Sequence, residues 1–184
     1  MKELSLHILD IVQNAITANA DHIHIGILED TKEDVLSITI NDDGDGMDED
    51  YLKQVINPFT TSRKTRRVGM GLPLLKQAAI ECEGDLKIES ARNIGTKVEV
   101  WFKHSHINRV PLGNMVETII TLLINGSHFD LQYTHKVNQH QMTFDTLEIR
   151  QVLGDVPLSH PDVIEWVRQS LQDEIMELYQ NYEG

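Results

Sequence analysis

Asp42-Asp43-Gly44-Asp45-Gly46 follows a stretch in which apolar and polar residues alternate, and these five residues decide the fold of the first half. The apolar members of two such stretches are Ile23, Ile25, Ile27, Leu36, Ile38 and Ile40. This alternation predicts two half-buried strands joined by a polar turn over residues 29–34. Glycine has no Cβ, so Gly44 and Gly46 let the chain bend sharply and lie against a neighbouring group. The pattern predicts an acidic turn at the end of a strand.

The segment before these strands is predicted to be an amphipathic helix over residues 3–19. Its apolar residues recur at helical spacing: Leu4, Ile8, Ile11, Val12, Ala15 and Ile16. Asp10 and Asn14 are four residues apart and therefore project from the same side of that helix. We expect this side to face a cleft above the sheet, although a solvated helix face would explain either residue alone.

The segment after the acidic turn predicts two more helices and two more strands. Asp48 is a suitable N-cap for a short helix that ends at residues 57–58, and a polar loop follows over residues 60–69. A helix starts at Gly71 and stops at Gly84. Residues 86–88 and 98–102 alternate like strands. This order predicts an α+β fold, a two-layer α/β sandwich with helices on one face of a mixed sheet.

Four segments resemble, in order, the N, G1, G2 and G3 boxes of the GHKL superfamily. This superfamily includes sensor histidine kinases, type II topoisomerases, heat-shock chaperones and mismatch-repair ATPases. The four segments are residues 10–15, 42–46, 69–74 and 95–96. The resemblance covers residues 3–103 and implies a Bergerat-type ATP-binding domain over residues 1–104. Residues 105–184 are then a C-terminal extension of helix, hairpin and helix.

The resemblance implies a role for each box. Asn14 would reach Mg²⁺ through its side-chain oxygen, and one amide ligand is enough because magnesium keeps waters and phosphate oxygens. Asp42 would accept a hydrogen bond from the adenine amine, with Gly44 and Gly46 beside the ring. Thr96 would join the water network around Asp42. A calcium loop is the alternative for residues 42–46, but it needs a glutamate at its twelfth position, which is occupied here by Lys53.

Asp10 stands where family members that hydrolyse ATP usually carry a glutamate that activates water. An aspartate can still act as a general base, but its side chain is one methylene shorter. The resemblance leaves three roles open for Asp10. It would activate water, accept a proton from a substrate hydroxyl, or polarise a metal-bound water.

The triphosphate is expected at the polar loop and at the start of the helix that follows it. A helix N-terminus offers free N–H groups and the positive end of a dipole. Four of the sixteen lysine and arginine residues fall within residues 63–67 of an acidic chain, which predicts a bound anion. A loop that balances the acidic surface is the alternative. The expected contacts are Thr60, Thr61, Arg63, Lys64, Gly69, Met70, Gly71 and Leu72.

The second half predicts a helix over residues 112–124, a hairpin, and an acidic helix from Ser159 to about residue 182. Aromatic residues at periodic positions are expected in the core: Phe129, Tyr133, Phe144 and Trp166. The histidines of this half suggest a metal site, but they lack zinc-type spacing. The extension could complete the core, form a dimer interface or dock a partner.

Composition restricts the partners and the compartment. The net charge of −13 argues against nucleic acid, whose phosphates require a basic surface. No segment has the ~20 apolar residues that span a bilayer, and the N-terminus does not resemble a signal peptide. The single cysteine, Cys82, fits a reducing cytoplasm. We therefore expect a cytoplasmic protein without a membrane or nucleic-acid partner.

The resemblance is closer to histidine kinases than to topoisomerases or chaperones, because of residues 58–61 and 69–74. The first box begins within ten residues of Met1, so we expect no phosphoacceptor helix pair ahead of it. His7 is expected at the surface or behind the site, without a phosphoacceptor role. The leading hypothesis is a soluble kinase-like ATP domain that acts on a separate protein, with a homodimer as one arrangement. The alternatives are an ATPase switch and a non-enzymatic ATP sensor.

Overall fold

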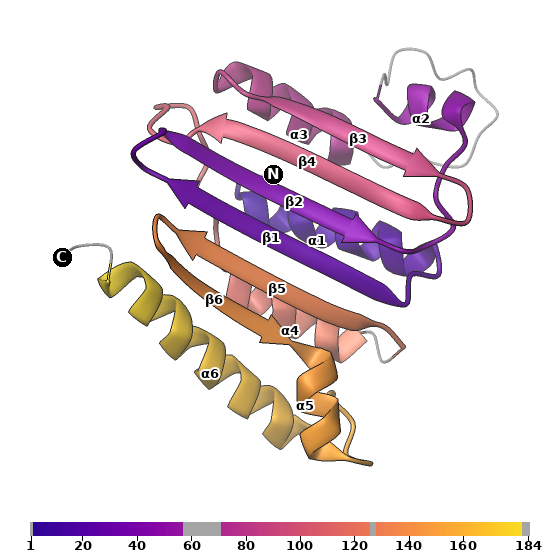
Figure 1. Ribbon diagram of the computed structural model, residues 1–184, viewed down its shortest axis with the longest axis vertical. Coiled ribbons are helices and arrows are strands. Elements are labelled where there is room, and N and C mark those ends of the chain that lie inside the picture. The colour runs from indigo at the N-terminus through magenta and orange to yellow at the C-terminus, as the bar shows by residue number, and fades with distance from the viewer. Residues whose placement is uncertain (1, 57–70, 126–127, 182–184) are drawn as a thin grey trace.

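The computed structural model describes residues 2–56, 71–125 and 128–181. Figure 1 labels the helices and strands of these residues. In chain order they are α1 (Leu4–Thr17), β1 (His22–Asp30), β2 (Val35–Asp42), α2 (Glu49–Ile56), α3 (Gly71–Glu81), β3 (Asp85–Ala91), β4 (Gly95–Lys103), α4 (Met115–Asn125), β5 (Asp130–Val137), β6 (His140–Asp145), α5 (Thr146–Leu153) and α6 (Pro161–Gln180).

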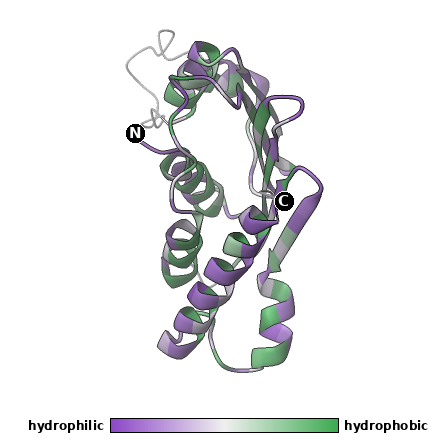
Figure 2. Cartoon of the chain, turned by 90° about the vertical axis from the view of Figure 1, so that its left-hand side faces the viewer, coloured by the Kyte–Doolittle hydropathy of each residue, from purple (hydrophilic) through white to green (hydrophobic). Residues whose placement is uncertain are grey.

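The strands form one six-stranded sheet in the order β3-β4-β2-β1-β5-β6. Neighbouring strands are antiparallel except β1 and β5, which are parallel. Seen from the side, the strands form one layer and most of the helices lie to one side of it (Figure 2). The predicted α+β class, with helices on one face of a mixed sheet, is confirmed.

A single hydrophobic core runs under the sheet from the first half of the chain into the second. Alternate residues of β1, including Ile23 and Ile25, are buried in it with Leu131 and Tyr133 of β5. Burial of such side chains is the main favourable term in folding. The boundary that we predict after residue 104 falls between β4 and α4, and the sheet and core continue across it.

Three features of the second half differ from the sequence prediction. Helix α5 was not predicted, and it starts where the Asp145 side chain accepts a hydrogen bond from the Leu147 N–H at 2.8 Å. The last helix begins at Pro161 rather than Ser159. Trp166 was expected in the core but is 58 % exposed, because the buried stripe of α6 runs through Val163 and Val167 instead.

The end of α3 also differs from the expectation. The left-handed residue that ends the helix is Glu83, with φ of 58°. Gly84 has a different role, because a Cβ added there would lie 1.8 Å from the Trp101 carbonyl oxygen. The glycine therefore allows the helix end to approach β4 closely.

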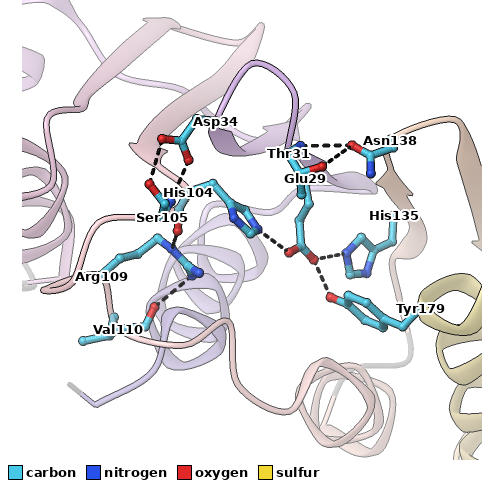
Figure 3. Close-up of polar contacts among 10 residues, drawn as sticks. All are labelled: Glu29, Thr31, Asp34, His104, Ser105, Arg109, Val110, His135, Asn138 and Tyr179. Atoms are coloured by element: carbon cyan, nitrogen blue, oxygen red, sulfur yellow. Dashed lines mark hydrogen bonds and ion pairs between the residues drawn. The ribbon is translucent and has the colours of Figure 1, made fainter. Parts of the chain in front are cut away.

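Near the C-terminal end of β1, the Glu29 carboxylate is hydrogen-bonded to side chains from three other segments of the chain (Figure 3). Glu29 is only 8 % exposed. It accepts hydrogen bonds from His135 Nε2 on β5 at 2.9 Å, from His104 Nε2 after β4 at 3.1 Å, and from the Tyr179 hydroxyl on α6. Burial alone would raise the pKa of Glu29, but these hydrogen bonds lower it to about 2.

Two histidines of the second half have a shared partner, because His104 and His135 both hydrogen-bond to Glu29. Within residues 2–56, 71–125 and 128–181, no group of three or more histidine, cysteine, aspartate or glutamate side chains could hold a metal ion. No helix in the described part of the chain is long and apolar enough to cross a membrane.

We predict that Glu29→Gln lowers the free energy of unfolding at pH 7 by about 3 kcal/mol. This figure follows from the fall in pKa from 4.5 to about 2. Because the folded-state pKa is the lower one, the stabilisation is present above about pH 4.5 and is lost as the pH falls towards 2. In urea unfolding measured from pH 7 to pH 3, the difference in the free energy of unfolding between the native protein and Glu29→Gln should become smaller as the pH falls.

The exposed carboxylate of Glu83 provides the control for this measurement. It lies 3.0 Å from Lys103 Nζ at the surface, where an ion pair contributes little. Glu83→Gln should keep the native stability and the native pH dependence. A constant gap between the native protein and Glu29→Gln at every pH would show that the Glu29 charge is not the cause.

Candidate functional site

Asp42 is the last residue of β2, an interior strand of the sheet. It pairs with Ile23 of β1 on one side and with Thr96 of β4 on the other. Its side chain follows the buried Ile40 by two residues and so points to the face of the sheet that the helices cover. Burial raises the pKa of Asp42, although backbone hydrogen bonds from Gly44 and Thr96 oppose the increase.

The backbone around Asp42 is packed so closely that it requires glycine. A Cβ added to Gly95, where φ is +123°, would lie 1.9 Å from the Asp42 carbonyl oxygen. A Cβ added to Gly46, where φ is +64°, would lie equally close to the Ala91 carbonyl oxygen. One at Gly44 would lie 2.7 Å from the Ala18 carbonyl oxygen. The acidic turn is therefore held between the end of α1 and the β3–β4 turn.

Helix α1 brings Asp10 and Asn14 to the same end of the sheet. The Ala18 carbonyl at the end of this helix accepts a hydrogen bond from the Asp45 N–H at 2.7 Å. Asn14 lies one turn earlier, and its side chain is exposed. Asp10 is half-buried, and its Oδ2 would be 1.9 Å from a Cβ on Gly71. The Asp10 carboxylate therefore lies against the first residue of α3, where the helix dipole favours negative charge.

Thr96 belongs to a small hydroxyl network that the sequence motifs did not reveal. Ser90 Oγ lies 2.9 Å from Thr96 Oγ1, accepts from the Met47 N–H at 2.8 Å and lies 3.0 Å from the Gly95 carbonyl oxygen. Ser90 faces Thr96 across the β3–β4 ladder. The sequence could have indicated Ser90 only through its position opposite Thr96 across the tight turn between the two strands.

The remaining expected contacts fall into two groups. Leu72 lies in the first turn of α3 and is half-buried, packed against the core. Six residues lie outside the described part of the chain, so their expected roles remain predictions: Thr60, Thr61, Arg63, Lys64, Gly69 and Met70.

An open hollow of about 420 Å³ lies at the end of β2, and Asp42 is among the residues that line it. Asn41 lines it, and Asn41 points away from the helices because neighbouring residues of a strand alternate between faces. Beside it, His22 Nδ1 lies 2.8 Å from Asp43 Oδ2, and this hydrogen bond raises the pKa of His22. Asp42 therefore belongs to the lining of this hollow, whereas Asp10 and Asn14 do not.

Residues 2–106 match the sequence profile of the family described as "Histidine kinase-, DNA gyrase B-, and HSP90-like ATPase". The chain belongs to this family. The matched region contains α1, the acidic turn, the start of α3 and Thr96, so the resemblance drawn from the four boxes is confirmed. Membership of this ATPase family supports ATP binding by residues 2–106.

Curated relatives include sensor kinases that are much longer than this chain. The tetrathionate sensor histidine kinase TtrS of Salmonella typhimurium is 32% identical over 104 residues, which cover 54% of this chain and 17% of that protein. Sporulation kinase C of Bacillus subtilis is 40% identical over 63 residues, which cover 34% and 14% respectively. The matched segments thus cover less than a fifth of the length of these relatives.

Solved structures show the same fold at low sequence identity. The N-terminal domain of a DNA repair protein has a TM-score of 0.52 at 15% identity and covers 78% of this chain and 52% of its own. The Aquifex aeolicus MutL ATPase domain complexed with ADP has a TM-score of 0.50 at 12% identity and covers 83% and 69%. The aligned parts, 78% and 83% of this chain, are longer than residues 2–106, so the shared fold includes part of the C-terminal extension.

We predict that Gly95→Ala destabilises the protein by about 3 kcal/mol or more, because its Cβ would overlap the Asp42 carbonyl. Gly154→Ala is a matched control, since Gly154 also has positive φ (+60°) but nothing lies within 4 Å of its added Cβ. The control should lose less stability, because it carries the backbone strain of a positive φ without a steric overlap. Equal losses in thermal unfolding would contradict the close packing beneath Asp42.

Proposed function

We propose that residues 2–106 bind Mg-ATP between α1, α3 and the end of the sheet. The supporting observation is that contacts of the backbone join α1, which carries Asp10 and Asn14, both to the acidic turn after Asp42 and to α3. The Ala18–Asp45 hydrogen bond ties α1 to the acidic turn, and the Asp10–Gly71 contact ties α1 to α3. Asp42 would accept a hydrogen bond from the adenine amine, because its carboxylate lies at the end of β2 on the covered face of the sheet, with a polar partner in Thr96.

The side chains at this end have the chemistry that Mg²⁺ requires. Asn14 is exposed, so its amide oxygen is available as a magnesium ligand. Bound magnesium would neutralise part of the negative charge of the phosphates. The phosphates would lie at the N-terminus of α3, beside the Asp10 carboxylate that lies against Gly71. Thr60, Thr61, Arg63, Lys64, Gly69 and Met70 remain proposed contacts.

We propose that the protein is a cytoplasmic kinase-like protein that acts on a separate partner protein. Two curated relatives that support this proposal are named a sensor histidine kinase and a sporulation kinase. In the proposed step, a nucleophilic atom of the partner forms a bond to the γ-phosphorus while the bond to the β-phosphate oxygen breaks, and ADP leaves. Asp10 would accept the proton of that nucleophile.

An ATPase switch is the second candidate, and Asp10 is the observation that favours it. Its carboxylate lies next to the expected phosphate position, so it could take a proton from water instead of from a partner. The γ-phosphoryl group would then leave as inorganic phosphate. A sensor that binds ATP without either reaction would need no proton acceptor at this position.

We predict that Asp42→Ala weakens Mg-ATP binding by about 10- to 100-fold, the value of one hydrogen bond to a charged group. Titration calorimetry with Mg-ATP measures this directly. Asp155→Ala is the matched control, because it removes the same charge from an exposed residue between α5 and α6. Native-like binding by Asp42→Ala would show that adenine is not recognised as proposed.

A second experiment distinguishes the three candidate functions: kinase, ATPase and ATP sensor. Incubation with ATP labelled on the γ-phosphate and with co-purifying proteins should label a partner and leave ADP. Asp10→Asn should retain Mg-ATP binding and lose this label, because the proton acceptor is gone. Label that appears only as free phosphate would favour the ATPase, and bound nucleotide that stays intact would favour the sensor.

A further inference from the structure

The Asp43 side chain fastens the acidic turn to the loop between α1 and β1. Its Oδ1 accepts hydrogen bonds from the backbone N–H groups of Asp21 and His22, each at 2.8 Å. Its Oδ2 lies 2.8 Å from His22 Nδ1. These contacts join residues that are 21 and 22 positions apart in the chain. Asp43 therefore links the end of β2 to the start of β1 through its side chain, in addition to the pairing of the two strands.

The two backbone N–H groups are the main partners of the Asp43 carboxylate. Burial alone would raise the pKa of Asp43, but the hydrogen bonds from His22 and Asp21 lower it. The side chains of His22 and Asp43 are 70 % and 44 % exposed, so the ion pair between them contributes little. Backbone N–H groups are donors at every pH, so this link does not depend on the protonation of His22.

Asp45 makes a second link between the same two segments. Its Oδ2 accepts a hydrogen bond from Asn19 Nδ2 at 2.9 Å, and its N–H donates to the Ala18 carbonyl oxygen at 2.7 Å. Asn19 has a positive φ of 59°, a conformation that asparagine adopts more readily than most residues. The loop from residue 18 to residue 22 is thus bound by residues 43–45 at several points.

Asp42 is held on one side by these links and on the other side by the β3–β4 turn. Strand β2 lies between β4 and β1 in the sheet. The close contact with Gly95 limits movement of the Asp42 carbonyl towards β4, and the bonds of Asp43 limit movement away from β1. A binding side chain is aimed only as accurately as its supporting residues hold it. Asp43 therefore helps to set where the Asp42 carboxylate lies.

We propose that Asp43 is a positioning residue that sets the selectivity of the nucleotide site for adenine. It keeps the Asp42 carboxylate aligned with the adenine amine and does not itself contact the nucleotide. A hydrogen bond weakens steeply when its geometry is poor, so misalignment of Asp42 removes the advantage of adenine. This inference rests on the proposed function, in which Asp42 accepts the hydrogen bond of that amine.

A comparison of two nucleotides distinguishes positioning from a general loss of structure. Purine riboside triphosphate has a hydrogen atom in place of the amine of ATP, so it has no exocyclic donor for Asp42. Titration calorimetry with both magnesium complexes should show that the native protein prefers ATP. We expect Asp43→Ala to bind ATP about five- to tenfold more weakly and the analogue less than about twofold more weakly. Partial unfolding would weaken both equally and leave the preference unchanged.

Two variants provide the controls. Asp43→Asn keeps a carbonyl oxygen that can accept from both backbone N–H groups, so it should recover most of the preference for ATP. Asp21→Ala removes a carboxylate of the same charge from an exposed residue of the same loop, while its backbone N–H stays available to Asp43. It should keep the native preference. An equal loss of preference in Asp21→Ala and Asp43→Ala would overturn the inference, because charge alone would explain both.

Hydrogen exchange of the Asp21 and His22 amides provides a readout that needs no nucleotide. These amides should exchange faster in Asp43→Ala and close to the native rate in Asp43→Asn. Unchanged exchange in Asp43→Ala would overturn the inference. If Asp43→Ala does not fold, Asp43→Ser takes its place, because one hydroxyl oxygen on a shorter side chain cannot reproduce both bonds. Its preference for ATP should then lie below that of Asp43→Asn.

The outcomes separate the failure of this inference from the failure of the proposed function. If the native protein binds neither nucleotide while exchange depends on Asp43, the proposed function and the selectivity role both fail, and only the contacts of Asp43 stand. If the native protein binds both nucleotides equally, adenine recognition by Asp42 fails, and the role of Asp43 fails with it. If the native protein prefers ATP and Asp43→Ala keeps that preference, the positioning role fails alone.

Discussion

The two halves of the chain are held together by the buried charge of Glu29, which needs hydrogen-bond donors from both halves. Its three side-chain donors come from the segment after β4, from β5 and from α6. The surrounding chain is fixed as well, since Arg109 Nε donates to the His104 carbonyl at 2.7 Å and the Asn138 N–H donates to the Glu29 carbonyl at 2.8 Å. A buried charge that loses a donor becomes strongly unfavourable, so the four segments hold together or separate together.

Strand β1 connects this cluster to the candidate site. Glu29 lies near one end of the strand, and Ile23, which pairs with Asp42, lies near the other. Six residues separate them, a distance of about 20 Å along a strand. The extension pairs with β1 over nearly its whole length. The second half of the chain thus supports the strand that lies beside Asp42, although none of its side chains needs to reach the nucleotide.

Local patterns predicted the parts of this structure that depend on neighbours in sequence. The alternation of apolar and polar residues predicted β1 and β2, and the helical spacing of apolar residues predicted α1. The glycines after Asp42 indicated the closely packed turn. The missed features depend on residues far apart in the chain. Tyr179 and Glu29 are separated by 150 positions, and the parallel pairing of β1 with β5 joins the two halves.

The position of Asp10 explains why the proposed site needs cations. Its carboxylate lies against the N-terminus of α3, the same place that phosphates would occupy. Two anions within a few ångströms repel each other strongly where water is excluded. Triphosphate can therefore approach only if positive charge comes with it, and one helix dipole supplies about half a charge. Magnesium on Asn14 and the basic residues at 63–67 would supply the remainder, so each would be needed because Asp10 already occupies the helix end.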